Sequence, residues 1–479
     1  MDRLLESYNL DVFGFPIQVN IVDRGSVVTY EIEEPPASAK DLEELEKLKL
    51  EILEKMPVNG ERIADISGLR QVVIGLVKGE IKSDRVSYYI LRDLVYYGPL
   101  TPFFWDKRIE DITVTSYHSP VTVYLKEYGY VQTNVTYKSE EEIVNLARRL
   151  SQLAGKQLSL ANPVVDGNLP DGSRIQISLG GVIATNGTSF TIRRFREKPI
   201  SFVDLCLLGT LTPDILAFIW TCIEYGANII VTGGTAAGKT TFLNAILQFV
   251  PQSKKIVTIE DTREINIIHD NWIPMVTRSS PVQEGQPGSS IDMFRLLESA
   301  LRHRPNYIIV GEVRGKEAFT IFQALSAGRY GLATFHAEDF EGFLHRMESN
   351  PINLPRTLLS TLDIVIVLST QFGSYGLERR LNDLIEIVGL DADSGDIISN
   401  YLYHRERDGY QYAGFSYVLD RIRAREGISA EDISSQVLKR EKLIRIMIER
   451  GLKDYDKISA AVDIFQHDQD RAVSFVEGQ

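Results

Sequence analysis

The segment "NIIVTGGTAAGKTTFLNAIL", residues 228–247, constrains the fold more than any other part of the chain. Its central letters, "GGTAAGKT", fit the pattern G-x-x-x-x-G-K-[ST], which forms phosphate-binding loops. The apolar run before the glycines is typical of a buried strand, and the apolar residues after them recur at helical spacing. A strand, a glycine-rich loop and a helix in this order predict a phosphate site in an α/β domain.

The residue types in this loop suit the binding of a nucleoside triphosphate. Glycines let backbone N–H groups converge on phosphate oxygens, and the N-terminus of the following helix adds a favourable dipole. We expect Lys239 to hold the β- and γ-phosphates and the hydroxyl of Thr240 to ligate Mg²⁺. The predicted phosphate-binding residues are Gly233, Gly234, Thr235, Ala236, Ala237, Gly238, Lys239, Thr240 and Thr241.

Polar side chains follow three further strand-like runs downstream of the loop. Glu260 ends the run "KKIVTIE"; it could orient an attacking water, although a solvated acidic turn would give the same pattern. Glu312 follows "NYIIVG", where a P-loop fold carries the carboxylate on the magnesium side, and Arg314 comes two residues later, near the expected γ-phosphate. His336 ends "GLATFH" and could hydrogen-bond that phosphate. Three polar strand ends beside one phosphate loop predict a catalytic site.

Length and composition set further limits. The 479 residues leave room for roughly three domains of about 150 residues each, and the net charge of -13 argues against broad binding to nucleic acid or anionic lipid. Two cysteines, Cys206 and Cys222, cannot supply a four-cysteine zinc cluster and fit a reducing compartment. The first residues do not read as a signal peptide, and no window of about 18 uncharged apolar residues predicts a membrane span. We therefore expect a cytoplasmic protein that works at a membrane only through a partner.

Hydrophobic periodicity divides the chain into successive parts. Short strands are followed by charged helices, and then by short alternating runs that predict a small antiparallel sheet. Ser139 and Glu142 predict a capped helix after that sheet, and from about residue 203 strands and helices alternate, as a mainly parallel sheet requires. The expected parts are a strand-rich segment at 1–40, an α+β domain at 41–195, a hinge linker at 196–202, a P-loop core at 203–375 and a mixed, then helical region at 376–479.

Four motifs occur in the order and spacing of one protein group. "GGTAAGKTT", "TIEDTREI", "RPNYIIVGEVRGKEA" and "GLATFHAED" resemble the Walker A motif, Asp box, Walker B motif and His box of the secretion ATPases of type II secretion, type IV pili and archaella, and of their type IV secretion relatives. The archaeal branch is the most similar, because "GPLTPFFWDKRIEDITV" and "VVDGNLPDGSRIQISL" look like parts of its N-terminal domain. Two departures are Asn306, where an Asp is usual, and Arg329, where the family usually has a second His.

The resemblance implies a fold and a set of residue roles. The fold would be a RecA-like P-loop NTPase domain at 203–375 with an α+β N-terminal domain and a helical C-terminal extension. Glu260 would activate water and Glu312 would act on Mg²⁺. Arginines of the N-terminal domain would reach a nucleotide, often at a subunit boundary, where such a residue is worth about 10³–10⁵ in rate. The candidate arginines, each of which could instead form a salt bridge on a strand face, are Arg174, Arg193 and Arg194.

The resemblance also implies an assembly and partners. The chain would form a homohexamer that hydrolyses ATP with Mg²⁺ and turns rotation about the hinge into mechanical work. Its partner would be a polytopic membrane platform protein, with pilin-like subunits as indirect substrates, so that the ring would lie at the inner face of the cell membrane. No stable binding of nucleic acid is expected.

Three alternatives share the phosphate loop. A P-loop kinase would need an acceptor pocket and a lid, for which no motif is evident. A GTP-controlled switch would need an N-K-x-D-type guanine reader, and none follows the loop. A conjugation-type ATPase that moves DNA shares the whole core, and net acidity and the lack of a basic aromatic groove argue against it. The sequence leaves open which secretion system or filament is served, and whether it is assembled or retracted.

Overall fold

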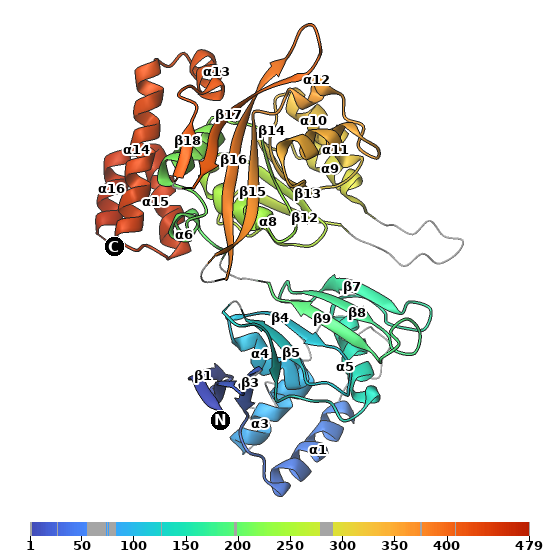
Figure 1. The fold of residues 1–479 in the computed structure, drawn as a ribbon. Coiled ribbons are helices and arrows are strands. Elements are labelled where there is room, and N and C mark those ends of the chain that lie inside the picture. The colour runs from blue at the N-terminus through green and yellow to red at the C-terminus, as the bar shows by residue number, and fades with distance from the viewer. Residues whose placement is uncertain are drawn as a thin grey trace. The chain divides into compact units, whose positions relative to one another are not determined.

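The chain divides into two compact units, Met1–Arg196 and Glu197–Gln479 (Figure 1). Each unit contains one nine-stranded sheet. Residues 196–198 of the expected hinge lie outside the described part of the chain. The computed structural model describes residues 2–25, 27–54, 73, 75, 83–125, 127–195, 199–277, 291–373, 376–407 and 409–478.

A largely antiparallel sheet organises the first unit, with the strand order β1-β2-β3-β6-β5-β4-β9-β8-β7. The strands expected as a separate N-terminal segment instead continue this sheet, because Thr29 and Tyr30 of β3 pair in parallel with Gln132 and Thr133 of β6. The strands are β1 (Arg3–Val12), β2 (Phe15–Asp23), β3 (Val28–Glu33), β4 (Ile109–Val114), β5 (Thr122–Leu125), β6 (Gly129–Thr133), β7 (Val164–Asn168), β8 (Arg174–Ser178) and β9 (Ser189–Arg193).

The described helices of this unit are short, apart from the first and the last. Ser139 caps the last helix by accepting the N–H of Glu142 at 3.3 Å, as predicted. The Glu142 carboxylate, however, accepts the N–H of Lys138 and not that of Ser139, so only half of the expected capping box forms. The helices are α1 (Ala39–Glu54), α3 (Asp84–Ile90), η1 (Leu91–Val95), η2 (Gly98–Leu100), α4 (Thr101–Trp105) and α5 (Glu140–Leu153).

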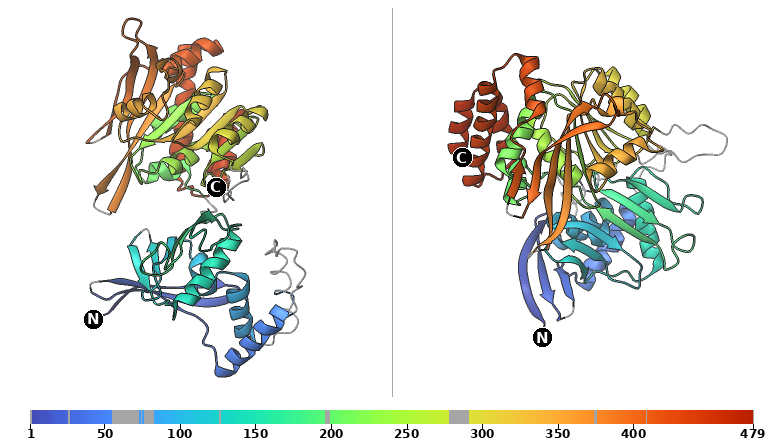
Figure 2. Two further views of the ribbon diagram at one scale, coloured as in Figure 1. Left: turned by 90° about the vertical axis from the view of Figure 1, so that its right-hand side faces the viewer. Right: turned by 45° about the horizontal axis from the view of Figure 1, so that its top comes forward.

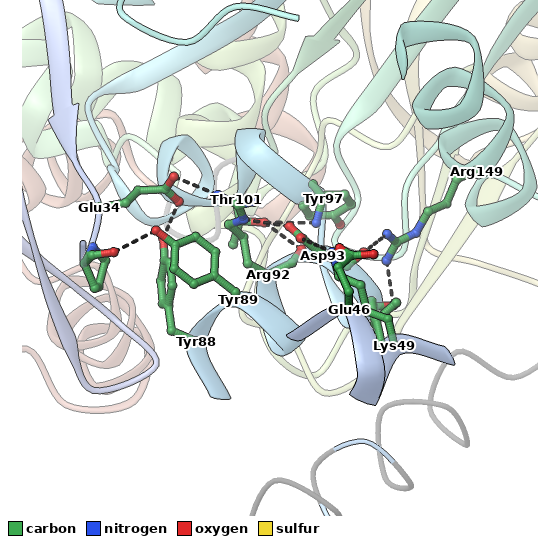
Figure 3. A network of polar contacts seen from close by, with 12 residues as sticks. Glu34, Glu46, Lys49, Tyr88, Tyr89, Arg92, Asp93, Tyr97, Thr101 and Arg149 are labelled. Atoms are coloured by element: carbon green, nitrogen blue, oxygen red, sulfur yellow. Dashed lines mark hydrogen bonds and ion pairs between the residues drawn. The ribbon is translucent and has the colours of Figure 1, made fainter. Parts of the chain in front are cut away.

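Charged side chains join these helices to one another and to the chain that leaves β3 (Figure 3). Arg92 of η1 donates to Glu34 and to Asp93, both at 2.7 Å. Asp93 also forms an ion pair with Lys49 of α1 at 3.1 Å, and Arg149 of α5 donates to the backbone carbonyl of Asp93. The network therefore holds α1, η1 and α5 together by contacts that the periodicity of the sequence could not reveal.

A second sheet, with the strand order β12-β11-β13-β14-β10-β15-β16-β17-β18, organises the second unit. Its strands from β12 to β15 run parallel, and β16, β17 and β18 extend it in antiparallel fashion. The phosphate-loop strand β10 lies between β14 and β15. The strands are β10 (Ile229–Gly233), β11 (Ile256–Glu260), β12 (Trp272–Val276), β13 (Tyr307–Val313), β14 (Tyr330–His336), β15 (Ile364–Gly373), β16 (Gly376–Leu390), β17 (Ile397–Glu406) and β18 (Gly409–Tyr412).

Helices cover both faces of this second sheet (Figure 2). On one face, α6, α7, α8 and the C-terminal helices share an apolar core with β10, and on the other face α9, α10 and α11 share a second core with β13 and β14. The helices are α6 (Phe202–Leu207), α7 (Pro213–Glu224), α8 (Lys239–Ile246), η3 (Leu247–Phe249), α9 (Met293–Arg302), α10 (Glu317–Ser326), α11 (Phe340–Glu348), α12 (Arg356–Leu359), α13 (Tyr417–Glu426), α14 (Ala430–Glu449), α15 (Tyr455–His467) and α16 (Gln469–Glu477).

The C-terminal helices belong to the core of the second unit. Arg440 of α14 has only 3% of its side chain exposed and forms an ion pair with Glu224 of α7 at 2.7 Å. Its guanidinium also lies over the rings of Trp220 and Phe465. Because β16–β18 extend the sheet and α14–α16 cover it, the expected boundary at residue 375 does not separate two packing units. Among the described helices, none is both long and apolar enough to cross a membrane.

Candidate nucleotide-binding site

The predicted phosphate loop joins β10 to α8 and has an unusual backbone. Gly238 has φ 82° and Gly233 has φ 158°, where a Cβ would lie 2.5 Å from the carbonyl oxygen of Leu368. Ala236, at the exposed apex, has φ 60°, a left-handed conformation that non-glycine residues rarely adopt. Since α8 begins directly after Gly238, the free N–H groups of its first turn adjoin the loop. The loop therefore has the backbone of an anion-binding turn.

The ammonium of Lys239 folds back onto the loop. Its Nζ donates to the carbonyl oxygens of Gly233 and Gly234, at 3.0 and 2.8 Å. Burial lowers the pKa of Lys239, and the Glu312 carboxylate opposes this effect. Lys239 of α8 and Glu312 of β13 therefore lie close enough to interact electrostatically, as expected if both belong to the same site.

The parallel strands bring the other predicted residues to the same edge of the sheet. β11, β13 and β14 carry Glu260, Glu312 and His336 at or near their carboxyl ends. The end of β10 is tied to the end of β14 by Thr232, whose hydroxyl donates to the carbonyl of Ala337 at 2.9 Å and accepts its N–H at 3.1 Å. This link could not be predicted from the sequence, because Thr232 and Ala337 are remote in the chain and Thr232 simply ends an apolar run.

Glu260 has the environment of a proton-transfer group. It is 2% exposed, and its Oε1 accepts the N–H groups of Glu264 and Ile265, both at 2.9 Å. Its Oε2 is buried and has no hydrogen-bond partner among the described residues. Burial raises the pKa of Glu260 to about 7, against the effect of the two backbone hydrogen bonds. A carboxyl with one oriented oxygen and a pKa near neutrality is suited to general acid–base chemistry.

Glu312 is held by a neighbouring arginine. The Nε of Arg314 donates to Glu312 at 2.9 Å, and the same guanidinium forms an ion pair with Asp261 at 3.6 Å. Asp261 also accepts the hydroxyl of Thr277 at 3.3 Å. These four residues border an open hollow of about 640 Å³. The predicted phosphate contact, Arg314, thus lies between two carboxylates, that of Asp261 directly after β11 and that of Glu312 within β13.

The ring of His336 has no hydrogen bond among the described residues, and its backbone carbonyl accepts a bond from Arg346. His336 borders a second open hollow, of about 720 Å³, together with Asp339 and His345. Thr334, two residues earlier on β14, is buried and donates to the carbonyl of Gly311, which links β14 to β13. A contact between His336 and a γ-phosphate stays a prediction.

The three candidate arginines of the first unit have different environments. The guanidinium of Arg194 donates to the carbonyls of Phe103, Phe104, Asp106 and Ile109, which places it inside its own unit. We therefore reassign Arg194 from a nucleotide contact to the support of α4.

Arg174 and Arg193 lie opposite one another on β8 and β9. Arg174 forms an ion pair with Asp166 at 2.6 Å, with both side chains more than 40% exposed. Arg193 is exposed and has no hydrogen bond or ion pair among the described residues. The exposed pair of Arg174 with Asp166 contributes little to stability, so a ligand could displace Asp166 at little cost, and the Arg193 side chain is itself exposed.

One arginine beside the loop belongs to none of the four motifs. Arg379 of β16 donates from Nε to the carbonyl of Ala236 at 2.9 Å. The motif "GGTAAGKT" gives no information about a strand that follows it by more than a hundred residues. Only the antiparallel extension of the sheet brings Arg379 to the loop.

The fold and this loop define a P-loop domain of the RecA-like class. A model of the family "Type II/IV secretion system protein" matches residues 96–372, which is more than half of the chain. The chain therefore belongs to this family, and the family predicted from the four motifs is confirmed.

Individual proteins are also similar to this chain. The uncharacterized protein MJ0900 of Methanocaldococcus jannaschii is 35% identical over 437 residues, which cover 89% of this chain and 78% of the relative. The putative conjugal transfer protein Rv3659c of Mycobacterium tuberculosis is 32% identical over 264 residues, or 53% of this chain and 72% of the relative. Among solved structures, the ATPase DotB of Legionella pneumophila matches with a TM-score of 0.41 at 17% identity, over 77% of this chain and 92% of that chain.

Proposed function

We propose that the chain is a mechanical ATPase that hydrolyses ATP with Mg²⁺ to drive a secretion or filament-assembly machine. The observation that carries this proposal is Glu260, a buried carboxyl with a pKa near neutrality at the end of a strand parallel to the phosphate-loop strand. Glu260 would take the proton of the attacking water. Thr240 would ligate Mg²⁺ directly, with Glu312 acting on the ion directly or through water.

Lys239 and Arg314 would bind the phosphates in this reaction. Lys239 now donates to two loop carbonyls, and the oxygens of a bound triphosphate would replace those carbonyls as the acceptors. Arg314 would leave Glu312, which frees that carboxylate for the magnesium ion. His336, at the end of the neighbouring strand, would hydrogen-bond the γ-phosphate.

We infer that the working form is a homohexamer. Arg193 and Arg174 are accessible and lie side by side in register on the first unit, so that they suit a nucleotide held by another copy of the chain. A rate contribution of about 10³–10⁵ from such an arginine would make hydrolysis depend on assembly. Rotation about the linker near residues 196–202 would then be the useful output, passed to a polytopic membrane platform protein that handles pilin-like subunits. The ring would lie at the cytoplasmic face of the membrane.

Hydrolysis and assembly can be tested separately. Lys239→Ala removes the cation expected at the β- and γ-phosphates, so phosphate release should fall to background while the variant still forms the same oligomer in light scattering. Arg193→Ala should also lose most of its turnover, but it should keep its affinity for ATP. Normal turnover by Lys239→Ala would refute the assignment of the site, and full activity of a monomeric wild-type chain would refute the ring.

A DNA-transfer ATPase is the second candidate, because a relative at 32% identity is described as a putative conjugal transfer protein. The net charge of -13 argues against it. Stimulation of hydrolysis by DNA that weakens steeply with salt would support this candidate. Co-purification of the intact chain with a polytopic membrane protein, without stimulation by DNA, would support the filament machine.

A further inference from the structure

Arg379 is placed over the phosphate loop by strand register. β15 pairs with β10 so that Leu368 lies opposite Gly233, the last residue of the phosphate-loop strand. β15 then runs on past this point, and Thr370 pairs with Arg379 of β16. Arg379 therefore lies two register positions beyond the end of β10, on the side where the loop begins.

Two close contacts fix the side chain of Arg379 against the loop. Its Nε donates to the carbonyl of Ala236 at 2.9 Å. Its Cδ lies 2.9 Å, and its Nε 3.5 Å, from the position that a Cβ on Gly238 would take. The Arg379 side chain thus occupies the space beside Gly238, the glycine that directly precedes α8, where the N–H groups that bind phosphate are expected.

The charge of Arg379 is not neutralised within the described part of the chain, where no carboxylate lies within ion-pair distance of it. The next residue offers a contrast. Arg380 forms an ion pair with Glu378 at 2.6 Å and donates to the carbonyl of Leu208 at 2.7 Å. Of the two arginines, only Arg379 presents an uncompensated guanidinium, whose two terminal nitrogens can bind a phosphate in bidentate fashion.

The direction from which Arg379 approaches indicates which phosphate it would meet. The carboxylates Glu260 and Glu312 come from β11 and β13, which lie on one side of β10 in the sheet, and the γ-phosphate is expected beside them. Arg379 comes from β16, on the opposite side of β10. The backbone of the loop near Gly238 is the part that holds the α- and β-phosphates in P-loops.

We propose that Arg379 binds the α/β-diphosphate portion of the nucleotide in cis, and so retains ADP as well as ATP. This inference rests on the proposed function, because it requires that the loop bind a nucleotide. Arg379, which comes from the antiparallel extension of the sheet, would thus join Lys239 and Arg314, the phosphate-binding cations that the motifs predict. The bond to Ala236 keeps the guanidinium beside the loop, in the position from which it reaches the diphosphate.

The test compares the binding of fluorescent ADP and ATP analogues to the full-length protein with Mg²⁺. Arg379→Gln should weaken both nucleotides equally, by about 10- to 100-fold, the usual range for a hydrogen bond to a charged group. Its KM should rise by a similar factor while kcat at saturation changes little, as expected when a contact is present in both ground and transition states. Arg379→Lys should recover part of the affinity, and Arg380→Gln, the matched control, should bind like the wild type.

Three results would overturn the inference. Unchanged affinity in Arg379→Gln would remove Arg379 from the site, while the proposed function would stand as long as the wild type hydrolyses ATP. Weaker ATP binding with unchanged ADP binding would move the contact to the γ-phosphate. An affinity loss with unaltered salt dependence would mean that Arg379 only supports the loop, because loss of a charge contact must reduce that dependence. A wild type that binds no nucleotide would instead refute the proposed function.

Discussion

The ionisation of Glu260 makes both stability and turnover depend on pH in a way that Glu260→Gln should remove. Burial raises its pKa from the ordinary 4.5 to about 7. That difference corresponds to about 3 kcal/mol that disfavours the charged form in the folded protein. The side chain is 2% exposed, so screening by solvent reduces this value little.

The sign of this pH effect depends on whether the unfolded or the folded protein loses the Glu260 proton at the lower pH. The unfolded chain ionises this carboxyl near pH 4.5, whereas the folded chain keeps its proton until about pH 7. Rising pH therefore destabilises the folded state between these values, and the full penalty is present above pH 7. The wild type should lose about 3 kcal/mol relative to Glu260→Gln between pH 4.5 and pH 8. The glutamine can still accept the N–H groups of Glu264 and Ile265.

The assay is urea-induced unfolding of both proteins at several pH values, followed by tryptophan fluorescence, with the difference in unfolding free energy plotted against pH. Glu298→Gln, at an exposed position of α9, is the control and should show no such trend. In parallel, kcat of the wild type should rise with pH about a midpoint near 7, because a base must be ionised, and Glu260→Gln should lose about 10²–10⁴ in kcat. A pH-independent stability difference would refute the assignment of a buried, proton-holding carboxyl, and near-normal turnover of the variant would refute its role as base.

Further substitutions test the loop, the helical region and the arginines. Gly233→Ala should unfold the second unit at a lower temperature because its Cβ would meet the Leu368 carbonyl at 2.5 Å, whereas Gly234→Ala, whose Cβ meets no atom closer than 3.8 Å, should melt like the wild type. Arg440→Ala should cost about 3–5 kcal/mol in denaturant unfolding, because it leaves a largely buried carboxylate unpaired. Arg194→Ala should lower the melting temperature of the first unit, and Arg193→Ala should change its stability by less than about 0.5 kcal/mol; the reverse pattern would contradict the roles given to these two residues.

The phosphate loop and the strands around it could be predicted from local patterns, because short stretches of sequence contain the residues that determine each of them. "GGTAAGKT" specifies its own turn, since only glycine suits positions such as 233 and 238. The buried runs that precede Glu260, Glu312 and His336 are short apolar strands, and parallel strands place their carboxyl ends at one edge. The family followed from these motifs alone.

The domain boundaries were harder to predict, because sheets join segments that are remote in sequence. Residues 1–40 read as strands, but nothing local indicates that β3 pairs with β6 about a hundred residues later. In the same way, the helices after residue 430 read as an extension, yet Arg440 and Glu224 join them to α7 in one core. Periodicity identifies which face of an element is apolar and does not identify what covers that face.

The sequence by itself determined the phosphate loop, the acidic and basic residues at the strand ends and the family, because each depends on residues close together in the chain. The tertiary structure decided how those residues are used. It buried Glu260 and raised its pKa, turned Arg194 inward onto four carbonyls, left Arg193 accessible, and brought Arg379 to the loop from a strand more than a hundred residues away. The physical reason is that burial, charge pairing and strand register depend on which segments become neighbours in space, which no local pattern of residues specifies.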